Sequence, residues 1–421
     1  MKVKGTKDFL PQEMILRQQV IERVKNVFER FGFQPIETPT IENWEVLSAK
    51  GAGGEEILNE TYNFEDKGGR KIGLRYDLTV PLARLIAENP NLPLPFKRYQ
   101  IEKVWRYGDI AKGRLREFLQ ADIDIVGAEK PIADAEVIAC AIECFNALGF
   151  KNFLVRLNNR KILAEILRLS NIKKEKVTDV LRSIDKLEKI GINEVKKELE
   201  EKCISKESIK KILEFIELKD ENILEKLEKL GVKEGIDELK EIIYYLKLWK
   251  LDSKVRIDLS LARGLDYYTG PIFEIFVEEG IGSLAGGGRY DNLIGLFLKK
   301  DISATGISLG IERIMEVIKE RKMINEVKNK TKIFVVAVND KVREKVLEIV
   351  KMLREKIAVD YDLRFRTLSK QLDYANAIGI PFTILVGENE LRENSVKIRD
   401  MKTGNEEIVG VNEILNYLNA R

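Results

Sequence analysis

A ligand-binding loop is indicated by the sequence LARGLDYYTGPIFEIF, at Leu261–Phe276. It places a guanidinium, a carboxylate and two phenols between two glycines, which allow the backbone to turn tightly. Arg263 can meet an anion, while Tyr267 and Tyr268 can stack on a ring or hydrogen-bond a polar group. The stretch therefore predicts a clasp for a small polar ligand, and its alternative is a hairpin whose tyrosines only pack.

A second set of polar residues lies in the run FLQADIDIVG, at residues 118–127. Apolar residues alternate there with Gln120, Asp122 and Asp124, and a period of two is typical of a strand with one apolar face. The amide and the two carboxylates therefore share the other face. Because burial of such groups costs free energy unless a partner satisfies them, the face is either a ligand site or an ordinary solvated surface.

Two further polar residues, Asp77 and Thr79, occur in LRYDLTVP, at the end of a predicted strand over Lys71–Thr79. Alternation puts Asp77 and Thr79 on the face opposite the apolar residues. We expect these two side chains to point into the same space as the acidic strand face described above.

A phosphate site is indicated by SATGISLGIERIMEVI, a short strand that turns at Gly310 into an amphipathic helix. Arg313 falls in the first turn of that helix. Free amides, the helix dipole and the guanidinium all favour a polyphosphate there, although an ordinary surface arginine gives the same pattern. Upstream, small residues in SLAGGGRYD suggest that the backbone approaches a bound group.

Longer periodic segments must position these residues. Apolar residues at helical spacing predict helices over Pro11–Phe31 and Lys130–Leu148. Between them FGFQPIETPTIE contains Pro35 and Pro39, which exclude helix and favour an edge strand or an interface. A run rich in Lys, Glu, Ile and Leu over Lys161–Leu248 predicts an inserted helical module, whose charges are either solvated helix faces or an RNA-facing surface.

A separate unit begins at Thr331, after a polar linker over residues 323–330. Buried strands there alternate with helices at short intervals, which predicts a small α/β domain. Its basic side chains form either an RNA-binding surface or scattered surface charge. They are Arg364, Arg366, Lys370, Lys397 and Arg399.

Composition narrows the chemistry. The 421 residues are 44% hydrophobic and 33% charged, which favours two or three folded domains. Because 72 basic residues nearly balance 69 acidic ones, any nucleic-acid contact must be a local patch. No apolar run approaches a membrane span and the three cysteines form no framework, so we expect a cytoplasmic protein. Zero histidines remove imidazole from every catalytic scheme.

Taken together, these motifs resemble the histidyl-tRNA synthetases, a family of class II aminoacyl-tRNA synthetases. The resemblance covers nearly all of the chain except the helical insert, and two of its motifs are highly specific: LARGLDYYTG and GRLREFLQADIDIVG. The other matching stretches are KGTKDFLP, FGFQPIETPTIE, LRYDLTVP, VWRYGDIAK, GGGRYD, GISLGIERI and LVGENEL.

The resemblance implies a role for individual residues. It makes Arg263 and Arg106 catalytic, since both would neutralise charge as the histidine carboxylate meets the α-phosphate. It assigns ATP to Arg106, Arg114 and Arg313, and a dimer interface to Pro39. The residues it assigns to histidine are Asp77, Thr79, Arg106, Gln120, Asp124, Arg263, Tyr267 and Tyr268.

The resemblance also implies the architecture and the reaction. The expected fold is an α+β catalytic domain with an antiparallel sheet over residues 1–325, a helical insertion at about 160–250, and a C-terminal α/β anticodon-binding domain over residues 331–421. The expected reaction is ATP-dependent ligation of L-histidine to tRNA(His) through histidyl-adenylate, with Mg²⁺, in a homodimer without membrane contact. Two alternatives are the catalytically silent regulatory subunit of ATP phosphoribosyltransferase and an RNA-binding protein that retains only the fold.

Overall fold

The protein divides into two compact units. The computed structural model describes residues 1–49, 54–218, 222–262, 267–277, 282–324 and 327–419. The first unit comprises Met1–Lys7 and Val20–Ile324, and the second comprises Asp8–Gln19 and Asn325–Arg421. The helix α1 (Pro11–Arg30) contributes to both units, and its buried residues in the first unit recur at helical spacing.

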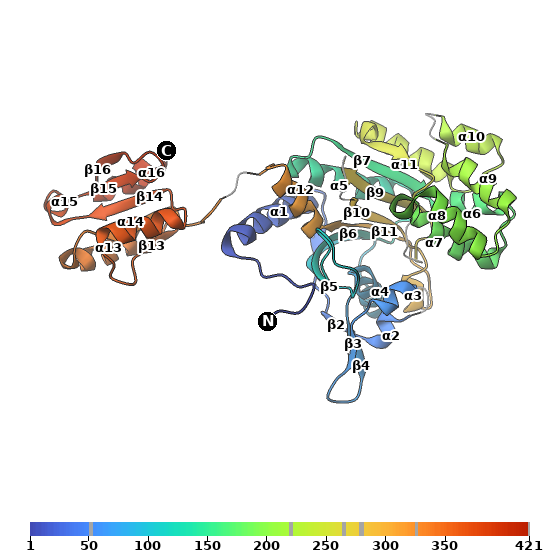
Figure 1. The fold of residues 1–421 in the computed structure, drawn as a ribbon, viewed down its shortest axis with the longest axis horizontal. Helices are drawn as coiled ribbons and strands as arrows, with labels where there is room; N and C mark the ends of the chain where they lie inside the picture. Colours follow the sequence, from blue (N-terminus) through green and yellow to red (C-terminus); the bar gives the residue numbers. More distant parts are fainter. Residues whose placement is uncertain (50–53, 219–221, 263–266, 278–281, 325–326, 420–421) are drawn as a thin grey trace. The chain divides into compact units, whose positions relative to one another are not determined.

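The first unit is built on an eight-stranded sheet (Figure 1). Its neighbours pair antiparallel except for the outermost strand at each edge, where β1·β5 and β7·β8 are parallel. The mainly antiparallel sheet predicted from the sequence is confirmed. In spatial order the strands are β1 (Gln34–Pro35), β5 (Phe96–Trp105), β6 (Glu117–Val126), β11 (Ala304–Gly310), β10 (Ser283–Arg289), β9 (Pro271–Val277), β7 (Phe153–Asn159) and β8 (Val255–Ile257).

Two helices and a proline-containing edge shape this sheet. The helix α5 (Ile132–Leu148) packs against β6 and β11, and Gly149 ends it in the left-handed conformation (φ 91°). The helix α12 (Ile311–Glu320) directly continues β11. Pro35 lies in β1 at the sheet edge, where the missing N–H of proline is tolerated.

In the described part of the chain between β1 and β5 there are a small three-stranded sheet and three short helices. The sheet has the order β2 (Ile41–Asn43), β4 (Lys71–Leu74), β3 (Asn63–Glu65), and the helices are α2 (Trp44–Leu47), α3 (Glu55–Asn59) and α4 (Thr79–Glu88). The strand predicted over Lys71–Thr79 is therefore wrong beyond Leu74. The backbone N–H of Val80 donates to the Asp77 carboxylate (3.0 Å), and this local bond starts a helix in place of further strand.

Among the described residues between β7 and β8 there are six α-helices. They are α6 (Arg160–Leu169), α7 (Val177–Asp185), α8 (Leu187–Glu201), α9 (Lys206–Ile216), α10 (Ile223–Lys229) and α11 (Ile236–Leu248). Figure 1 shows α6–α10 gathered as a bundle, with α11 beside β7. Apolar residues of this bundle, such as Leu163 and Ile212, belong to the same core as Val126 and Ile272 of the sheet. The helices thus pack on the sheet's core.

The second unit contains a five-stranded sheet between helices. Its strands in spatial order are β13 (Val359–Tyr361), β12 (Ile333–Ala337), β14 (Phe382–Val386), β15 (Ser395–Asp400) and β16 (Glu406–Gly410). Its helices are α13 (Arg343–Arg354), α14 (Leu368–Ala377), α15 (Glu388–Arg392) and α16 (Ile414–Asn419). Alternate residues of β12 belong to two different cores, so the sheet is buried on both faces, as the predicted α/β domain requires.

Within the described residues, no helix is long and apolar enough to cross a membrane. Cys140 and Cys144 are buried in α5, and the third cysteine, Cys203, is exposed.

Candidate active site

A cavity of about 350 Å³ lies over one face of β6. Strands β6, β9, β10 and β11, the helix α12 and the turn before α4 all contribute to its wall, and α7 of the helical segment adds Asp185. Of the predicted site residues, Arg263 lies outside the described residues. All the others line the cavity: Asp77, Thr79, Arg106, Arg114, Gln120, Asp124, Tyr267, Tyr268 and Arg313.

The floor of the cavity is the polar face of β6. Gln120, Asp122 and Asp124 project from alternate positions of that strand. Antiparallel pairing with β11 sets Gly306 opposite Asp124 and Ser308 opposite Asp122. A Cβ atom on Gly306 would overlap the Asp124 carboxylate. Glycine is therefore needed on β11 for this carboxylate to occupy the floor.

A buried arginine supports the floor from the neighbouring strand. The register of β5 on β6 pairs Arg98 with Asp124, and Arg98 Nη2 lies 2.7 Å from Asp124 Oδ2. Arg98 is 0% exposed and also donates to the carbonyl of Leu78 (3.1 Å). Its Nε and Nη1 atoms have no hydrogen-bond partner, so the contact with Asp124 is an ion pair rather than a bidentate hydrogen bond. Such a buried pair is strongly destabilised when one partner is removed.

Asp77 reaches the floor from the turn before α4. Its Oδ1 atom accepts the Val80 N–H, while its Oδ2 atom is buried without a hydrogen-bond partner. Gln120 Oε1 and Asp122 Oδ1 are buried and lack a partner in the same way. Three buried acceptors around one cavity therefore lack hydrogen-bond donors, which favours a ligand rich in N–H groups.

Burial changes the ionisation of the floor. It raises the pKa of Asp77 to about 6, against the opposing effect of the Val80 N–H and the Arg106 charge. It raises the pKa of Asp122 to about 7, where Arg98 opposes the rise and the charge of Asp124 adds to it. The pKa of Asp124 is also raised by burial, while the positive charge of Arg98 opposes the rise.

Three tyrosines form the wall beside Asp124. The ring centroids of Tyr267 and Tyr268 lie 4.8 Å apart, and those of Tyr267 and Tyr290 lie 5.8 Å apart, both edge to face. The Tyr290 hydroxyl donates to Asp124 Oδ1. The wall is therefore aromatic, and a planar ring can pack against it.

Arginines line the cavity toward the Gln120 end of β6, since Arg106 follows β5 and Arg313 lies on the helix that follows Gly310, the partner of Gln120. Arg106 Nε donates to the carbonyl of Tyr76 (2.9 Å), and Arg313 Nη1 donates to the carbonyl of Ser283 (2.7 Å). Arg114 lies in the tight turn of the loop between β5 and β6. These guanidinium groups, with the N-terminus of α12, can hold an anion such as a polyphosphate.

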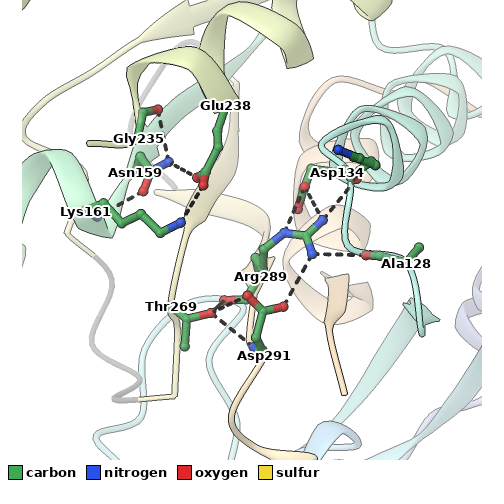
Figure 2. Close-up of polar contacts among 10 residues, drawn as sticks. Ala128, Asp134, Asn159, Lys161, Gly235, Glu238, Thr269, Arg289 and Asp291 are labelled. Atoms are coloured by element: carbon green, nitrogen blue, oxygen red, sulfur yellow. Dashed lines mark hydrogen bonds and ion pairs between the residues drawn. The ribbon is translucent and has the colours of Figure 1, made fainter. Parts of the chain in front are cut away.

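A buried ion pair anchors the described end of the predicted loop (Figure 2). Arg289 donates to Asp134 through Nε (3.1 Å) and Nη2 (2.5 Å), and to the carbonyl of Ala128. The carbonyl of Arg289 accepts the Thr269 N–H, and the Thr269 hydroxyl donates to Asp291 (3.2 Å). Thr269, next to the two cavity tyrosines, is thus tied to α5.

Three consecutive residues connect the loop to the helical segment. The Asn158 side chain donates to the carbonyl of Leu261 (2.8 Å), and Arg160 donates to the carbonyls of Ala262 and Gly270. Between them, Asn159 donates to Gly235 and to Glu238 (2.6 Å) of the segment that starts α11, as Figure 2 shows. Displacement of α11 would therefore strain the contacts that hold both flanks of the loop.

Two residues of the site, Arg98 and Tyr290, were not predicted as site residues. Asp122 was predicted on the polar face of this strand by alternation, although the resemblance assigned it no role. Arg98 and Tyr290 carried no comparable signal, because their contacts with Asp124 depend on strand register.

Among the described residues, no group of three His, Cys, Asp or Glu side chains is arranged to hold a metal ion. The cavity also has carboxylates outside its floor, Glu274 on β9 and Glu312 on α12.

The second unit has a cavity of about 490 Å³ beside the end of β13. Phe365 lines it with an exposed ring, and the Arg343 guanidinium lies 3.8 Å from the ring centroid. The basic surface predicted here is partly neutralised. Arg366 pairs with Asp362 (2.6 Å), and Lys397 and Arg399 both lie near Glu406.

Comparisons with known proteins cover both units. The family model described as "Histidyl-tRNA synthetase" matches residues 5–314, and the one described as "Anticodon binding domain" matches residues 332–421. The chain is 40% identical to "Histidine–tRNA ligase 1" of Bacillus anthracis over 99% of both chains. It is 39% identical to "Histidine–tRNA ligase" of Thermococcus kodakarensis, covering 99% of this chain and 98% of the relative.

Solved structures agree with these matches. The crystal structure of histidyl-tRNA synthetase from Nostoc sp. PCC 7120 superimposes with a TM-score of 0.86 at 32% identity, covering 100% of this chain and 99% of that one. A structure described as an ATP phosphoribosyltransferase regulatory subunit/histidyl-tRNA synthetase from Bacillus halodurans C gives 0.76 at 22% identity, covering 90% and 96%. At that identity the second likeness concerns the fold alone.

Proposed function

We propose, from the premise that this chain belongs to the histidyl-tRNA synthetase family, that the cavity over β6 is where histidine and ATP react. The chain is a histidine–tRNA ligase, and its match to an anticodon-binding domain argues against the regulatory subunit of ATP phosphoribosyltransferase. The observation that carries the proposal is the division of one cavity into an acceptor-rich floor and an arginine-rich part.

Histidine occupies the floor. Its ammonium and imidazole groups supply N–H donors for the buried oxygens of Asp77, Gln120 and Asp122, and its ring packs on the wall formed by Tyr267 and Tyr268. An apolar side chain of similar shape would leave these oxygens unpaired. The floor therefore favours histidine over an apolar ligand, because binding the apolar ligand costs the free energy of burying unsatisfied polar groups.

ATP occupies the arginine-rich part. Arg106 meets the α-phosphate and the histidine carboxylate, and Arg313 meets the γ-phosphate, with Arg114 as a further phosphate contact. Mg²⁺ commonly binds one or two carboxylates together with substrate phosphates, and Glu274 and Glu312 fit that requirement. When bound with the nucleotide, Mg²⁺ supplies positive charge that offsets the phosphate charge.

The reaction needs positioning and charge rather than a general base. A carboxylate oxygen of histidine attacks the α-phosphorus, the bond to the bridging oxygen breaks, and pyrophosphate leaves. Arg106 and Arg263 stabilise the negative charge on the α-phosphate oxygens during this displacement. The chain contains no histidine, and the scheme requires none, because the attacking carboxylate is already ionised.

The second unit binds tRNA(His), and two copies of the chain form a dimer. The match to an anticodon-binding domain and the exposed ring of Phe365 support the first statement. The resemblance of the segment containing Pro39, and the exposure of Pro39 and Ile41, support the second. Sedimentation equilibrium should give about twice the chain mass of 48.3 kDa, and a monomer at micromolar concentration would contradict the dimer.

The experiment for the proposed function is exchange of labelled pyrophosphate into ATP by the purified protein. We expect exchange that requires histidine and is not supported by the other standard amino acids. With tRNA(His) added, the same protein should form histidyl-tRNA. Absence of histidine-dependent exchange would refute the proposal.

A further inference from the structure

The floor of the cavity holds three carboxyl groups and one guanidinium. Asp77, Asp122 and Asp124 are each 2% exposed. Arg98 is the cation buried with them, and its ion pair is made with Asp124. The floor therefore carries more negative than positive charge when all three carboxyl groups are ionised.

Asp122 is the carboxyl group with the least compensation. Asp124 has the Arg98 ion pair and the Tyr290 hydroxyl, and Asp77 has the Val80 N–H. Asp122 has the charge of Arg98, which already pairs with Asp124, and a hydrogen bond with the Ser308 side chain, while its Oδ1 atom is buried without a partner. A ligand group that enters the floor is therefore expected to meet Asp122 Oδ1.

The reaction fixes which end of histidine enters the floor. Its carboxylate must meet ATP, so that end faces the arginine-rich part of the cavity. The ammonium group then lies near Asp77 and Gln120, and the imidazole extends along β6 toward Asp122 and Asp124. Successive residues on one face of a strand are spaced about 6.6 Å apart, which is close to the length of a histidine side chain.

We propose that the bound imidazole and the Asp122 carboxyl group share one proton, so that Asp122 couples histidine recognition to proton uptake at mildly alkaline pH. The inference rests on the proposed function of the cavity. It assigns to Asp122 a specificity role that follows from its burial and its unpaired oxygen.

The charges around the floor explain the shared proton. Arg98 and the substrate ammonium offset two of the three carboxylates, and a proton between Asp122 and the ring offsets the third. Without that proton, the Asp122 carboxylate would be a buried negative charge beside a neutral ring, with no positive charge to offset it. With it, either an imidazolium donates to Asp122 or the protonated carboxyl group donates to the ring.

The other charged groups of the cavity are not among the main influences on the pKa of Asp122. Arg106, just after β5, acts on Asp77 and with Arg313 on α12 serves the carboxylate and the phosphates. Glu274 on β9 and Glu312 on α12 add negative charge, and Tyr290 donates to Asp124. Burial raises the pKa of Asp122 to about 7, so its carboxyl group can hold a proton near neutral pH.

Proton exchange on histidine binding should have opposite signs above and below neutral pH. At about pH 8, free Asp122 is mostly ionised and free imidazole, with a pKa of about 6.5, is mostly neutral, so binding takes up nearly one proton. At about pH 5.5 both groups are protonated before binding, so binding releases a proton. Histidine affinity should therefore fall on the order of tenfold per pH unit above neutrality and reach its maximum near pH 7.

The test is titration calorimetry of the full-length protein with histidine in buffers of different ionisation enthalpy. At pH 8 we expect uptake close to one proton for the native protein and close to zero for Asp122→Asn, whose amide cannot ionise. Asp109→Asn is the matched control, because Asp109 lines the same cavity from an exposed loop and its replacement should leave the uptake unchanged. ATP binding and thermal unfolding establish that Asp122→Asn is folded.

Two results would overturn the proposal: no proton uptake by the native protein at pH 8, or uptake by Asp122→Asn equal to the native value. Either can occur while histidine still binds and supports pyrophosphate exchange. Loss of the proposed function itself would differ, because no heat of histidine binding would then be observed.

Discussion

Replacement of Arg98 by methionine is a direct test of the charge balance beneath the site. Methionine is uncharged and close in length to the arginine stem, so the change removes the guanidinium that pairs with Asp124 at 2.7 Å. Because the pair is 0% and 3% exposed, the remaining carboxylate is poorly solvated. Breaking such a pair costs about 3–5 kcal/mol, and we expect this loss in the free energy of unfolding of the first unit at pH 8.

The loss in the free energy of unfolding should be larger at high pH than at low pH. A carboxyl group whose pKa in the folded state exceeds its unfolded value stabilises the protein below the unfolded pKa, and this contribution is lost as the pH rises through the folded pKa. Burial already raises the pKa of Asp124, and removal of Arg98 raises it further. The variant should therefore be closest to the native protein near pH 5 and weakest at pH 8.

Urea denaturation at several pH values measures this effect. Arg168→Met is the control, because the Arg168 side chain is 66% exposed in its ion pair with Glu165, and such pairs contribute about 0–1 kcal/mol. Adding Asp124→Asn to Arg98→Met should restore part of the stability at pH 8. A loss for Arg98→Met no larger than for the control, or one independent of pH, would refute the argument.

Three further predictions concern the site and the second unit. Asp77→Asn should weaken histidine binding about 10- to 100-fold by calorimetry while ATP binding is unchanged, because a charge-assisted bond contributes about 1.5–3 kcal/mol. Arg263→Ala should bind both substrates nearly normally but form adenylate on the order of 100-fold more slowly, and an unchanged single-turnover rate would contradict its role. Phe365→Ala should raise the KM for tRNA about 5- to 100-fold, since stacking on a base contributes about 1–3 kcal/mol, and pyrophosphate exchange should not change.

Alternation along β6 was sufficient to predict the acidic floor from the sequence, because the period of a strand determines which side chains share a face. The position of Asp77 was predicted correctly for the wrong reason. The sequence KIGLRYDLT alternates beyond Leu74, but the bond between Asp77 and the Val80 N–H begins a helix there. An alternating sequence does not show that a hydrogen bond from a side chain to the nearby backbone will end the strand.

Contacts that depend on register or on turns could not be predicted. The pairing of Arg98 with Asp124 follows from the alignment of β5 on β6, which no property of either strand taken alone specifies. In the second unit, β13 ends at Tyr361 although the sequence DYDLRFRT continues to alternate. Asp362 accepts hydrogen bonds from the backbone and side chain of Arg366, and Phe365 adopts a positive φ of 53°.

The central claim is that one cavity holds histidine and ATP together, and a stable sulfamoyl analogue of histidyl-adenylate tests it most directly. Such an analogue should bind at least on the order of 100-fold more tightly than histidine or ATP alone, because one molecule spans the floor and the arginine-rich part. It should also displace both substrates at a stoichiometry of one per chain. An analogue that binds no more tightly than histidine, or that displaces only one of the two substrates, would contradict the claim.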